Sequence, residues 1–343
     1  MVKVLVTGGA GYIGSHVVQS LLKSNYQVVI IDNLVSGNLD LVKNILKVPI
    51  IIGEIGNENL IESILDGSHP LCLGERIEAV MHFAGFTSSE ESVKDPKKYY
   101  ENNLSESLTL LKSILKEQKR RMNKKSSKIP FLFSSSCATY GIPFKLPIKE
   151  EDPQFPFNAY GRSKLMFEYI IDDFWKAYKI PSVIFRYFNA AGANLDGLMG
   201  EKRASETHII PLLFDASNNK EAIFKIFGDD YPTPDGTCIR DYVHVVDIAE
   251  AHVKGLNKIL KDGGKHIYNL GTGRGYSVKE IISEVELTIS EKINVKTFER
   301  RDGDVPILIA SAEKAREELK WIPQYSDLKT IIRSAHNWHK KIN

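Results

Sequence analysis

The chain has little cysteine, little net charge and no long apolar run, and each shortage excludes a class of protein. Its three cysteines, Cys72, Cys137 and Cys238, are widely spaced and form no Cys-x-x-Cys pair, which argues against a disulfide framework and a zinc site. Lysine and arginine total 45 against 43 aspartate and glutamate, so a nucleic-acid partner has no electrostatic basis. No apolar run reaches the roughly 18 residues that a membrane span needs, and Val2–Val6 is too short for a signal peptide. We therefore expect a cytoplasmic protein without a membrane, nucleic-acid or metal partner.

Short apolar runs alternate with helical patterns along much of the chain. The run Val2–Val6 leads through a glycine-rich turn into a helical pattern and then into a second apolar run, Val28–Ile31. This alternation predicts an α/β fold with a Rossmann-type, doubly wound parallel sheet that carries helices on both faces. Further strands of this sheet are expected at Ile50–Ile52, Ala79–Phe83, Phe131–Phe133, Ser182–Phe185 and His266–Leu270.

The length of the chain predicts two domains. At 343 residues it exceeds the size at which one hydrophobic core stops growing, roughly 250–300 residues. After about Asn189 the pattern becomes irregular and rich in glycine and proline. We expect a larger domain over residues 1–188, to which strands near 243–272 return, and a smaller C-terminal α/β substrate domain over residues 189–343.

A glycine triplet follows the first predicted strand and opens a helix. Gly8, Gly11 and Gly14 have the spacing with which a chain turns tightly, approaches a pyrophosphate and places a helix N-terminus against it. Asp32 lies 18 residues after Gly14, where a carboxylate accepts hydrogen bonds from the ribose of an adenine dinucleotide. The same carboxylate repels a 2′-phosphate, so NAD is favoured over NADP as the cofactor.

Two other motifs are interpreted as structural. The segment Leu270–Gly275 is rich in glycine, but its spacing fits a phosphate cradle poorly, so we expect a loop at the sheet edge. Ser277 and Glu280 form a capping box for the helix that follows. The basic stretch Lys116–Lys128 is interpreted as a solvated loop or helix end, with an anion-binding patch as the alternative.

Tyr160 and Lys164 carry the catalytic signal, because their spacing places them on one face of a helix. An ammonium beside a phenol stabilises the phenolate and lowers the phenol pKa from about 10, which yields a general base near neutral pH. Tyr325 and Lys329 have the same spacing, but they lack the preceding glycine cradle and serine strand, so we interpret that pair as chance.

A serine cluster after the predicted strand Phe131–Phe133 distinguishes the first pair. Hydroxyl groups at the carboxyl end of a parallel strand face the crevice where ligands bind, so Ser136 can relay a proton between a substrate hydroxyl and a phenolate. The alternative is a turn with capping hydroxyls. Cys137 is an alternative nucleophile, but no histidine or other base lies next to it in the sequence.

Several motifs, in this order and spacing, resemble those of the UDP-glucose 4-epimerases, a family of extended short-chain dehydrogenase/reductases. The resemblance covers nearly the whole chain, and its most specific part is the block that joins FGDDYPTPDGT to RDYVH. The motifs are TGGAGYIGSH, Asp32-Asn33, HFAG, ESVKDPKKYYENN, SSSCATYG, YGRSK, RYFN, FGDDYPTPDGTCIRDYVHV and RRDGD.

The resemblance implies a set of site residues and no metal. Ser136, Tyr160 and Lys164 would be catalytic, and the first two would also contact the substrate. The implied NAD site consists of Gly8, Gly11, Tyr12, Ile13, Gly14, Asp32, Asn33, Ser36, Gly37, Glu54, Ile55, Phe83, Ala84, Gly85, Asn102, Tyr160, Lys164 and Phe188. The rest of the implied UDP-sugar site consists of Asn189, His208, Lys225, Ile226, Phe227, Arg240, Arg301, Asp304 and Leu308.

The same resemblance implies the reaction, which is the interconversion of UDP-galactose and UDP-glucose in galactose metabolism by transient oxidation at C4 with bound NAD. Some members carry a bulky tyrosine and others a small cysteine where Leu308 stands, so N-acetylated UDP-hexoses are further candidate substrates. Residues 1–188 would then bind NAD, and residues 189–343 would mainly bind the UDP-sugar. A homodimer is implied, through helices near 103–118 and 160–178.

Two alternatives stay open. A nucleotide-sugar dehydratase or decarboxylase could use the same scaffold, but a dehydratase commonly has Asp-Glu after the serines, where this chain has Cys137-Ala138. An NAD-binding regulatory protein would need no intact catalytic set, whereas Ser136, Tyr160 and Lys164 are all present.

Overall fold

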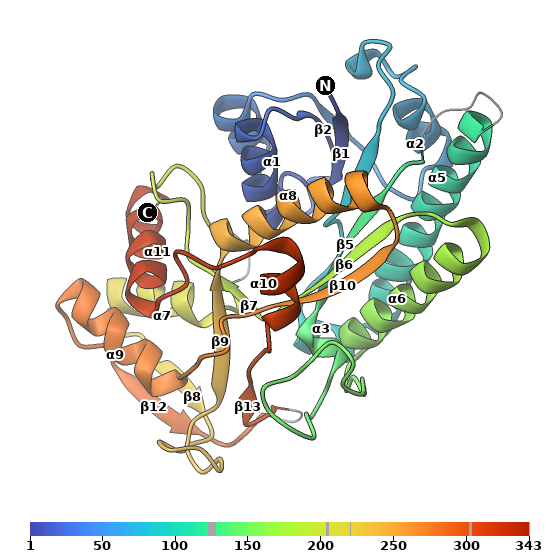
Figure 1. Ribbon diagram of the computed structural model, residues 1–343. Helices are drawn as coiled ribbons and strands as arrows, with labels where there is room; N and C mark the ends of the chain where they lie inside the picture. The colour runs from blue at the N-terminus through green and yellow to red at the C-terminus, as the bar shows by residue number, and fades with distance from the viewer. Residues whose placement is uncertain (123–127, 204–205, 220, 302–303, 343) are drawn as a thin grey trace. The chain divides into compact units, whose positions relative to one another are not determined.

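The computed structural model describes residues 1–122, 128–203, 206–219, 221–301 and 304–342, which form two compact units (Figure 1). The first unit comprises residues 1–140, 154–186 and 249–268, and the second comprises 141–153, 187–248 and 269–343. The chain therefore passes between the units several times. The assignment of a cofactor to one unit and a substrate to the other stays a prediction.

The first unit is built on a seven-stranded sheet with the order β10-β6-β5-β4-β1-β2-β3. The neighbours β1–β2, β2–β3, β1–β4 and β4–β5 pair in parallel. The strand order reverses beside β1, which confirms the predicted doubly wound, Rossmann-type fold. The strands are β1 Lys3–Thr7, β2 Gln27–Asp32, β3 Ile50–Ile52, β4 Ala79–His82, β5 Phe131–Ser136, β6 Ser182–Tyr187 and β10 Lys265–Leu270.

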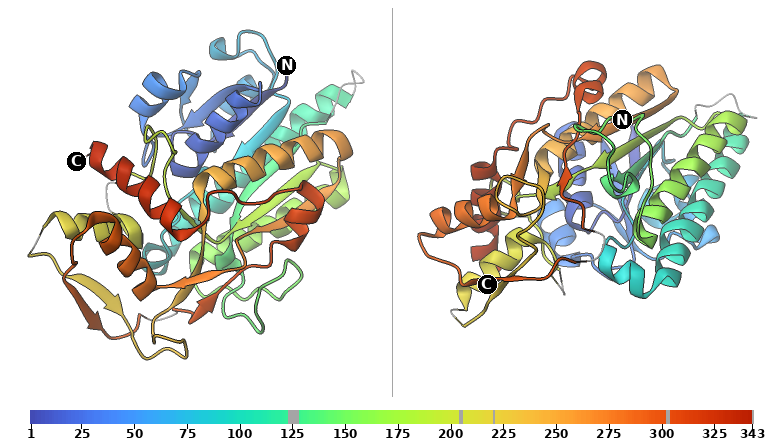
Figure 2. Two further views of the ribbon diagram at one scale, coloured as in Figure 1. Left: turned by 60° about the vertical axis from the view of Figure 1, so that its left-hand side comes forward. Right: turned by 90° about the horizontal axis from the view of Figure 1, so that it is seen from below.

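Helices pack on both faces of this sheet, because its strands are apolar on both sides. Buried leucine, isoleucine and phenylalanine side chains of α2, α5 and α6 form one core with β1–β6, while α1 and α8 lie across the other face (Figures 1 and 2). The longer helices of this part are α1 Tyr12–Lys23, α2 Glu58–Leu65, α3 Ser89–Lys94, α4 Pro96–Tyr100, α5 Ser107–Met122, α6 Ala159–Tyr178 and α8 Val245–Asp262. Short helical turns are η1 Leu41–Leu46, η2 Pro70–Cys72, η3 Glu101–Glu106 and η4 Cys137–Thr139.

The second unit has its own small sheets and its own core. Strand β9 lies at the centre of a four-stranded sheet, pairing with β11 in antiparallel and with β13 and β7 in parallel orientation, and β8 pairs with β12. Helices α7, α9 and α11 supply most of the apolar core. The elements are β7 Asn189–Ala191, β8 Phe224–Phe227, β9 Ile239–His244, β11 Gly275–Ser277, β12 Val295–Phe298, β13 Ile307–Leu308, α7 Ile209–Asn218, α9 Val278–Ile289, α10 Glu313–Leu319 and α11 Leu328–Ile342.

The predicted capping box is present at the start of α9, where Ser277 and Glu280 each accept a backbone N–H of the other. Among the described helices, none has both the length and the apolar character that a bilayer crossing demands.

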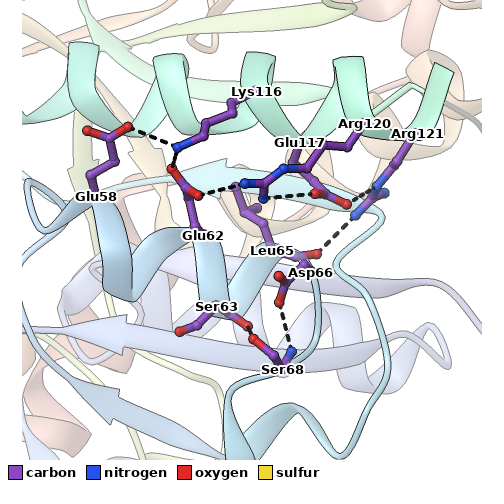
Figure 3. A network of polar contacts seen from close by, with 10 residues as sticks. All are labelled: Glu58, Glu62, Ser63, Leu65, Asp66, Ser68, Lys116, Glu117, Arg120 and Arg121. Carbon is purple, nitrogen blue, oxygen red and sulfur yellow. Dashed lines mark hydrogen bonds and ion pairs between the residues drawn. The ribbon is translucent and has the colours of Figure 1, made fainter. Parts of the chain in front are cut away.

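The first part of the basic stretch is a helix end, as interpreted, since it forms the last turns of α5, but two of its charged side chains are not solvated. Glu117 and Arg121 are both buried, and Arg121 donates to Glu117 over 2.9 Å and to the carbonyl oxygen of Leu65 over 3.0 Å (Figure 3). Lys116 and Arg120 reach across to Glu62 on α2. These charges therefore fasten α5 to α2. Residues 123–127 of the stretch lie outside the described residues.

We expect the variant Glu117→Gln to lower the free energy of unfolding by about 3–5 kcal/mol, because it leaves the buried Arg121 guanidinium without its counter-charge. Denaturant unfolding monitored by circular dichroism measures this. The control is Glu62→Gln, whose partners Lys116 and Arg120 are about half exposed, so its loss should stay below about 1 kcal/mol. Equal losses in the two variants would contradict the distinction between buried and exposed pairs.

Candidate active site

The turn between β1 and α1 has room for glycine alone at two of the three predicted positions. Gly8 has a φ of +67°, and a methyl group there would lie 2.6 Å from the backbone nitrogen of Ala84. A methyl group at Gly14 would lie 2.2 Å from the carbonyl oxygen of Gly8. Gly11 is the N-cap of α1 and, because it has no side chain, leaves the first N–H groups of the helix without a side-chain cap. The turn therefore forms the open cradle at a helix N-terminus that fits a dinucleotide pyrophosphate, with Tyr12 and Ile13 in the first helical turn.

Asp32 ends β2 as a nearly buried carboxylate. Its Oδ2 accepts the N–H of Ala10 over 3.0 Å, and its Oδ1 accepts the N–H of Leu34 over 2.9 Å. Burial raises the pKa of Asp32, and these two hydrogen bonds oppose that rise. The following turn, which includes Ser36, wraps closely around the carboxylate, since a methyl group at Gly37 would lie 2.7 Å from Oδ1.

Two residues of the implied NAD site, one after β2 and one after β3, form a hydrogen bond. Asn33 donates to Oε2 of Glu54 over 3.0 Å. Ile55, the next residue, is buried in the core shared with α2 and α5. The structure thus places Asp32, Asn33, Glu54 and Ile55 after neighbouring parallel strands, on the edge of the sheet where ligands of this fold bind.

The segment after β4 is held by an asparagine that the sequence analysis did not select. Asn103 donates to the carbonyl of Phe86 over 2.9 Å and accepts its N–H over 2.8 Å. A methyl group at Gly85 would lie 3.0 Å from Oδ1 of Asn103 and 3.8 Å from Nζ of Lys164. The predicted Asn102 is its half-buried neighbour in the π-helical turn η3. The doublet in YYENN was the available signal, but the sequence alone does not show which asparagine is buried.

Ser136, Tyr160 and Lys164 lie at the end of β5 and in the first turns of α6. Lys164 is 4% exposed, donates from Nζ to the carbonyl oxygen of Ser134 over 2.8 Å and lies 4.8 Å above the Phe133 ring. Burial lowers the pKa of Lys164 to about 8. The Ser136 hydroxyl oxygen accepts the N–H of Ala138, as the capping alternative expects, and its own proton can still be donated. Capping and proton relay are therefore compatible at Ser136.

The second pair with the same spacing differs in structure. Tyr325 lies before α11, which begins at Leu328, so Tyr325 and Lys329 do not share a helix. The backbone N–H of Tyr325 instead donates to Asp247 over 2.9 Å. This agrees with the interpretation of that spacing as chance.

Two further buried groups beside the catalytic pair were not predicted. His82 on β4 contacts Thr7 through Nδ1 over 2.7 Å and Ser107 through Nε2 over 2.8 Å, and burial lowers its pKa to about 3. Glu168 on α6 is 4% exposed and pairs with Arg186. The signal for Glu168 was present, because it continues the spacing of four residues from Tyr160 and Lys164.

In the second unit, four of the predicted substrate residues lie together. Arg301 donates to Asp304 over 3.1 Å and lies 4.8 Å above the Phe227 ring, and Arg240 lies 3.8 Å from the same aspartate. Leu308 on β13 pairs with Arg240 in the sheet register. The group offers two guanidinium forks and an aromatic face, which suits a nucleoside diphosphate. Lys225 and Ile226 precede Phe227 on β8, and Asn189 begins β7.

Asp241 follows Arg240 on β9 and has surroundings of its own. Asp241 is fully buried and accepts the N–H groups of Thr272, Gly273 and Ala310 over 2.8, 3.1 and 3.2 Å. Neighbouring residues of a strand point to opposite faces, so Arg240 and Asp241 cannot pair along the strand. Asp241 instead fixes the glycine-rich loop after β10, which has a structural role as predicted.

His208 and Phe188 have separate surroundings in the second unit. His208 is the N-cap residue of α7, and its Nδ1 lies 2.7 Å from Glu201, which also pairs with Arg203. Burial acts to raise the pKa of Glu201, but His208 and Arg203 together lower it. Glu206 lies close enough for a cation to be shared with Glu201 and His208, yet the Arg203 charge already balances Glu201, and we assign no metal. The N–H of Phe188 donates to the carbonyl of Leu270 over 3.1 Å.

A doubly wound sheet, a glycine cradle and a Tyr-x-x-x-Lys pair beside a serine together define a short-chain dehydrogenase/reductase. The family model described as GDP-mannose 4,6 dehydratase matches residues 5–334. A UDP-glucose 4-epimerase of Rhizobium leguminosarum bv. trifolii is 43% identical over 340 residues, which are 99% of this chain and 98% of that relative.

Solved structures agree with these matches. A UDP-glucose 4-epimerase from Brucella ovis in complex with NAD has a TM-score of 0.88 and 40% identity, covering 98% of this chain and 99% of the other. One from Bifidobacterium longum in complex with NAD⁺ and UDP has a TM-score of 0.88 and 37% identity, covering 99% and 98%. The chain belongs to the UDP-glucose 4-epimerase family.

Proposed function

We propose that the protein is an NAD-dependent UDP-glucose 4-epimerase, which interconverts UDP-galactose and UDP-glucose. The observation that carries the proposal is the buried Lys164 ammonium held at the end of β5, on the helix face that also bears Tyr160. Full-length similarity to proteins of this activity supports it. The reaction belongs to galactose metabolism, and Leu308, intermediate in size, makes N-acetylated UDP-hexoses further candidate substrates.

The first unit fits NAD. Gly8 and Gly14 let the turn pack tightly against the backbone after β4 and against the start of α1, and α1 presents its N-terminal N–H groups there. Asp32 offers the remaining lone pairs of its carboxylate to the adenosine ribose. When bound, NAD supplies the hydride acceptor and donor for C4 of the sugar. Relatives crystallised with NAD support this assignment.

The protein's own groups move the proton and hold the substrate. Tyr160 takes the proton from the C4 hydroxyl and later returns it, while the Lys164 charge favours the phenolate. Ser136 relays this proton through its hydroxyl. Arg240 and Arg301 bind the diphosphate, and Asp304 accepts from the uridine ribose. A firmly held UDP leaves the sugar free to present either face.

We expect Asp32→Asn to lower the preference for NAD over NADP by about tenfold or more. The change removes the negative charge that repels a 2′-phosphate but keeps the shape of the side chain. Dissociation constants for both cofactors, measured by calorimetry, test this. Glu54→Gln is the control, because it removes a neighbouring charge whose oxygen accepts from Asn33, and the ratio of its two dissociation constants should change by less than about threefold. An unchanged ratio in Asp32→Asn would refute the role of the charge.

Two observations separate the epimerase from its alternatives. A dehydratase needs acid–base groups after the serine, and the positions after Ser136 hold Cys137 and Ala138 in the turn η4. A buried lysine is destabilising when it is charged, and a regulatory NAD-binding protein would not require one. The epimerase is therefore the function that the site supports best.

We also propose that the protein is cytoplasmic and forms a homodimer. Helix α6 exposes three large side chains, with Met166 at 42%, Tyr169 at 59% and Tyr178 at 43% exposure. Met166 and Tyr169 are three residues apart and therefore neighbours on one face of the helix, which suits a helical interface with a second copy, together with α5. Analytical ultracentrifugation of the purified protein tests it.

The decisive experiment is incubation of the purified protein with UDP-galactose and no added nicotinamide cofactor. UDP-glucose should accumulate to an equilibrium mixture, because the cofactor is regenerated in each turnover. Release of a 4-keto-6-deoxy product would indicate a dehydratase. No conversion of UDP-galactose, in protein shown to contain NAD, would refute the proposed function.

A further inference from the structure

A buried ion pair lies one helical turn beyond Lys164 on α6. Tyr160, Lys164 and Glu168 follow one another at intervals of four residues and share one face of the helix. The carboxylate of Glu168 accepts Nη2 of Arg186 over 2.6 Å, and Nε of Arg186 lies 3.1 and 3.2 Å from its two oxygens. Both side chains are almost fully buried. The carboxylate is therefore held by a guanidinium on the helix that also bears the lysine.

The ion pair is fixed from two other directions. Ser135 on β5 donates its hydroxyl to Oε1 of Glu168. Arg186 on β6 also donates to the Tyr140 hydroxyl over 2.8 Å and to Oε1 of Gln154 over 3.0 Å. Helix α6 and strands β5 and β6 thus hold one carboxylate in a defined place.

We propose that Glu168 is a positioning residue for the proposed reaction, whose buried charge keeps the Lys164 ammonium protonated and held against β5. The inference rests on the proposed function, because that function gives the Lys164 ammonium its role beside Tyr160. Lys164 is itself buried, and burial lowers its pKa to about 8, while the charge of Glu168 opposes the lowering. Without this carboxylate the lysine would lose its proton near neutral pH, and the phenol would lose the charge that favours its deprotonation.

The other groups around Lys164 do not supply this compensation. His82 on β4 is buried, and because burial lowers its pKa to about 3 it is neutral. The Phe133 ring and the Ser134 carbonyl attract the ammonium without carrying a charge. Tyr160 on the same helix is the group on which the ammonium acts. Arg186 is a cation that pairs with Glu168, and of these two residues it is Glu168 whose charge raises the pKa of Lys164.

The variant Glu168→Gln removes the charge and keeps the shape. In the holoenzyme, we expect the alkaline limb of the pH profile of kcat/KM to move to lower pH by about one unit or more, because Lys164 releases its proton earlier. Glu117→Gln is the matched control, since it also removes a carboxylate from a buried ion pair. It should lower stability and leave the limb in place.

A second measurement needs no activity. The pKa of Lys164 in the folded protein, about 8, lies below that of an unfolded lysine, so the unfolded state binds more protons between these values. The free energy of unfolding therefore rises with pH from about 8 up to roughly 10.4. In Glu168→Gln the rise should begin at lower pH, and adding Lys164→Met should abolish it. This readout separates failure of the inference from failure of the proposed function.

The inference is overturned if Glu168→Gln only loses stability, as Glu117→Gln does, with neither the alkaline limb nor the onset of the stability rise displaced. If Glu168→Gln does not fold, Glu168→Asp decides, because it keeps the charge and withdraws the carboxylate by one methylene toward the α6 backbone. A smaller downward displacement of both readouts then supports the inference, and unchanged values overturn it.

Discussion

The variant Tyr160→Phe should lose epimerase turnover by on the order of 10³-fold while it keeps its fold, its NAD and its affinity for UDP. The phenol oxygen is the proposed proton acceptor, and phenylalanine fills the same volume at the start of α6 without it. Turnover of UDP-galactose, the NAD released on denaturation and the dissociation constant of UDP measure the three properties. Turnover close to that of the unchanged protein would remove Tyr160 as the base.

A matched control exists within the same chain. Tyr325 has a lysine four residues later, as Tyr160 does, but it lies before α11 with its backbone bound to Asp247. Tyr325→Phe should therefore leave turnover within about twofold, an effect of less than about 0.5 kcal/mol on the barrier. A loss equal to that of Tyr160→Phe would mean that the spacing alone does not identify the catalytic residue.

Gly14→Ala should remove most of the bound NAD and lower the free energy of unfolding by about 1–3 kcal/mol. Its methyl group would lie 2.2 Å from the carbonyl oxygen of Gly8, so the turn must open or α1 must move away from β1. Either movement displaces the N–H groups that face the pyrophosphate. NAD content after purification and calorimetric affinity for NAD measure the effect.

The comparison is Gly11→Ala in the same turn. Its methyl group would meet the same oxygen of Gly8 at 3.3 Å, a close contact that a few tenths of an ångström relieve. We expect this variant to retain more NAD and more stability than Gly14→Ala. If Gly11→Ala and Gly14→Ala lose equal amounts of bound NAD and of stability, the close helix–strand approach is not what requires glycine at position 14.

The parts of the fold that follow from local signals could be predicted from the sequence. Short apolar runs bounded by glycine gave the strands, because a strand buried on both faces needs apolar residues at successive positions. The cradle at Gly8–Gly14 followed from backbone requirements that only glycine meets. The roles assigned to individual site residues stay predictions until they are measured.

The features that sequence analysis missed depend on contacts between distant segments. Glu117 and Arg121 stand in a run of charges that is typical of solvated helix ends, and the carbonyl of Leu65 on another helix is what makes their burial stable. The pairing of Glu168 with Arg186 joins residues of two different elements.

The route of the chain through the first unit sets an order on its synthesis. His252 of α8 packs 4.4 Å from the Phe185 ring and 4.9 Å from the Phe83 ring, and β10 is the last strand of the sheet to be made. A ribosome that has translated only 188 residues has therefore delivered a sheet with one bare edge and with one face that still lacks α8. The first unit cannot be completed until about 80 further residues, including much of the other unit, have emerged.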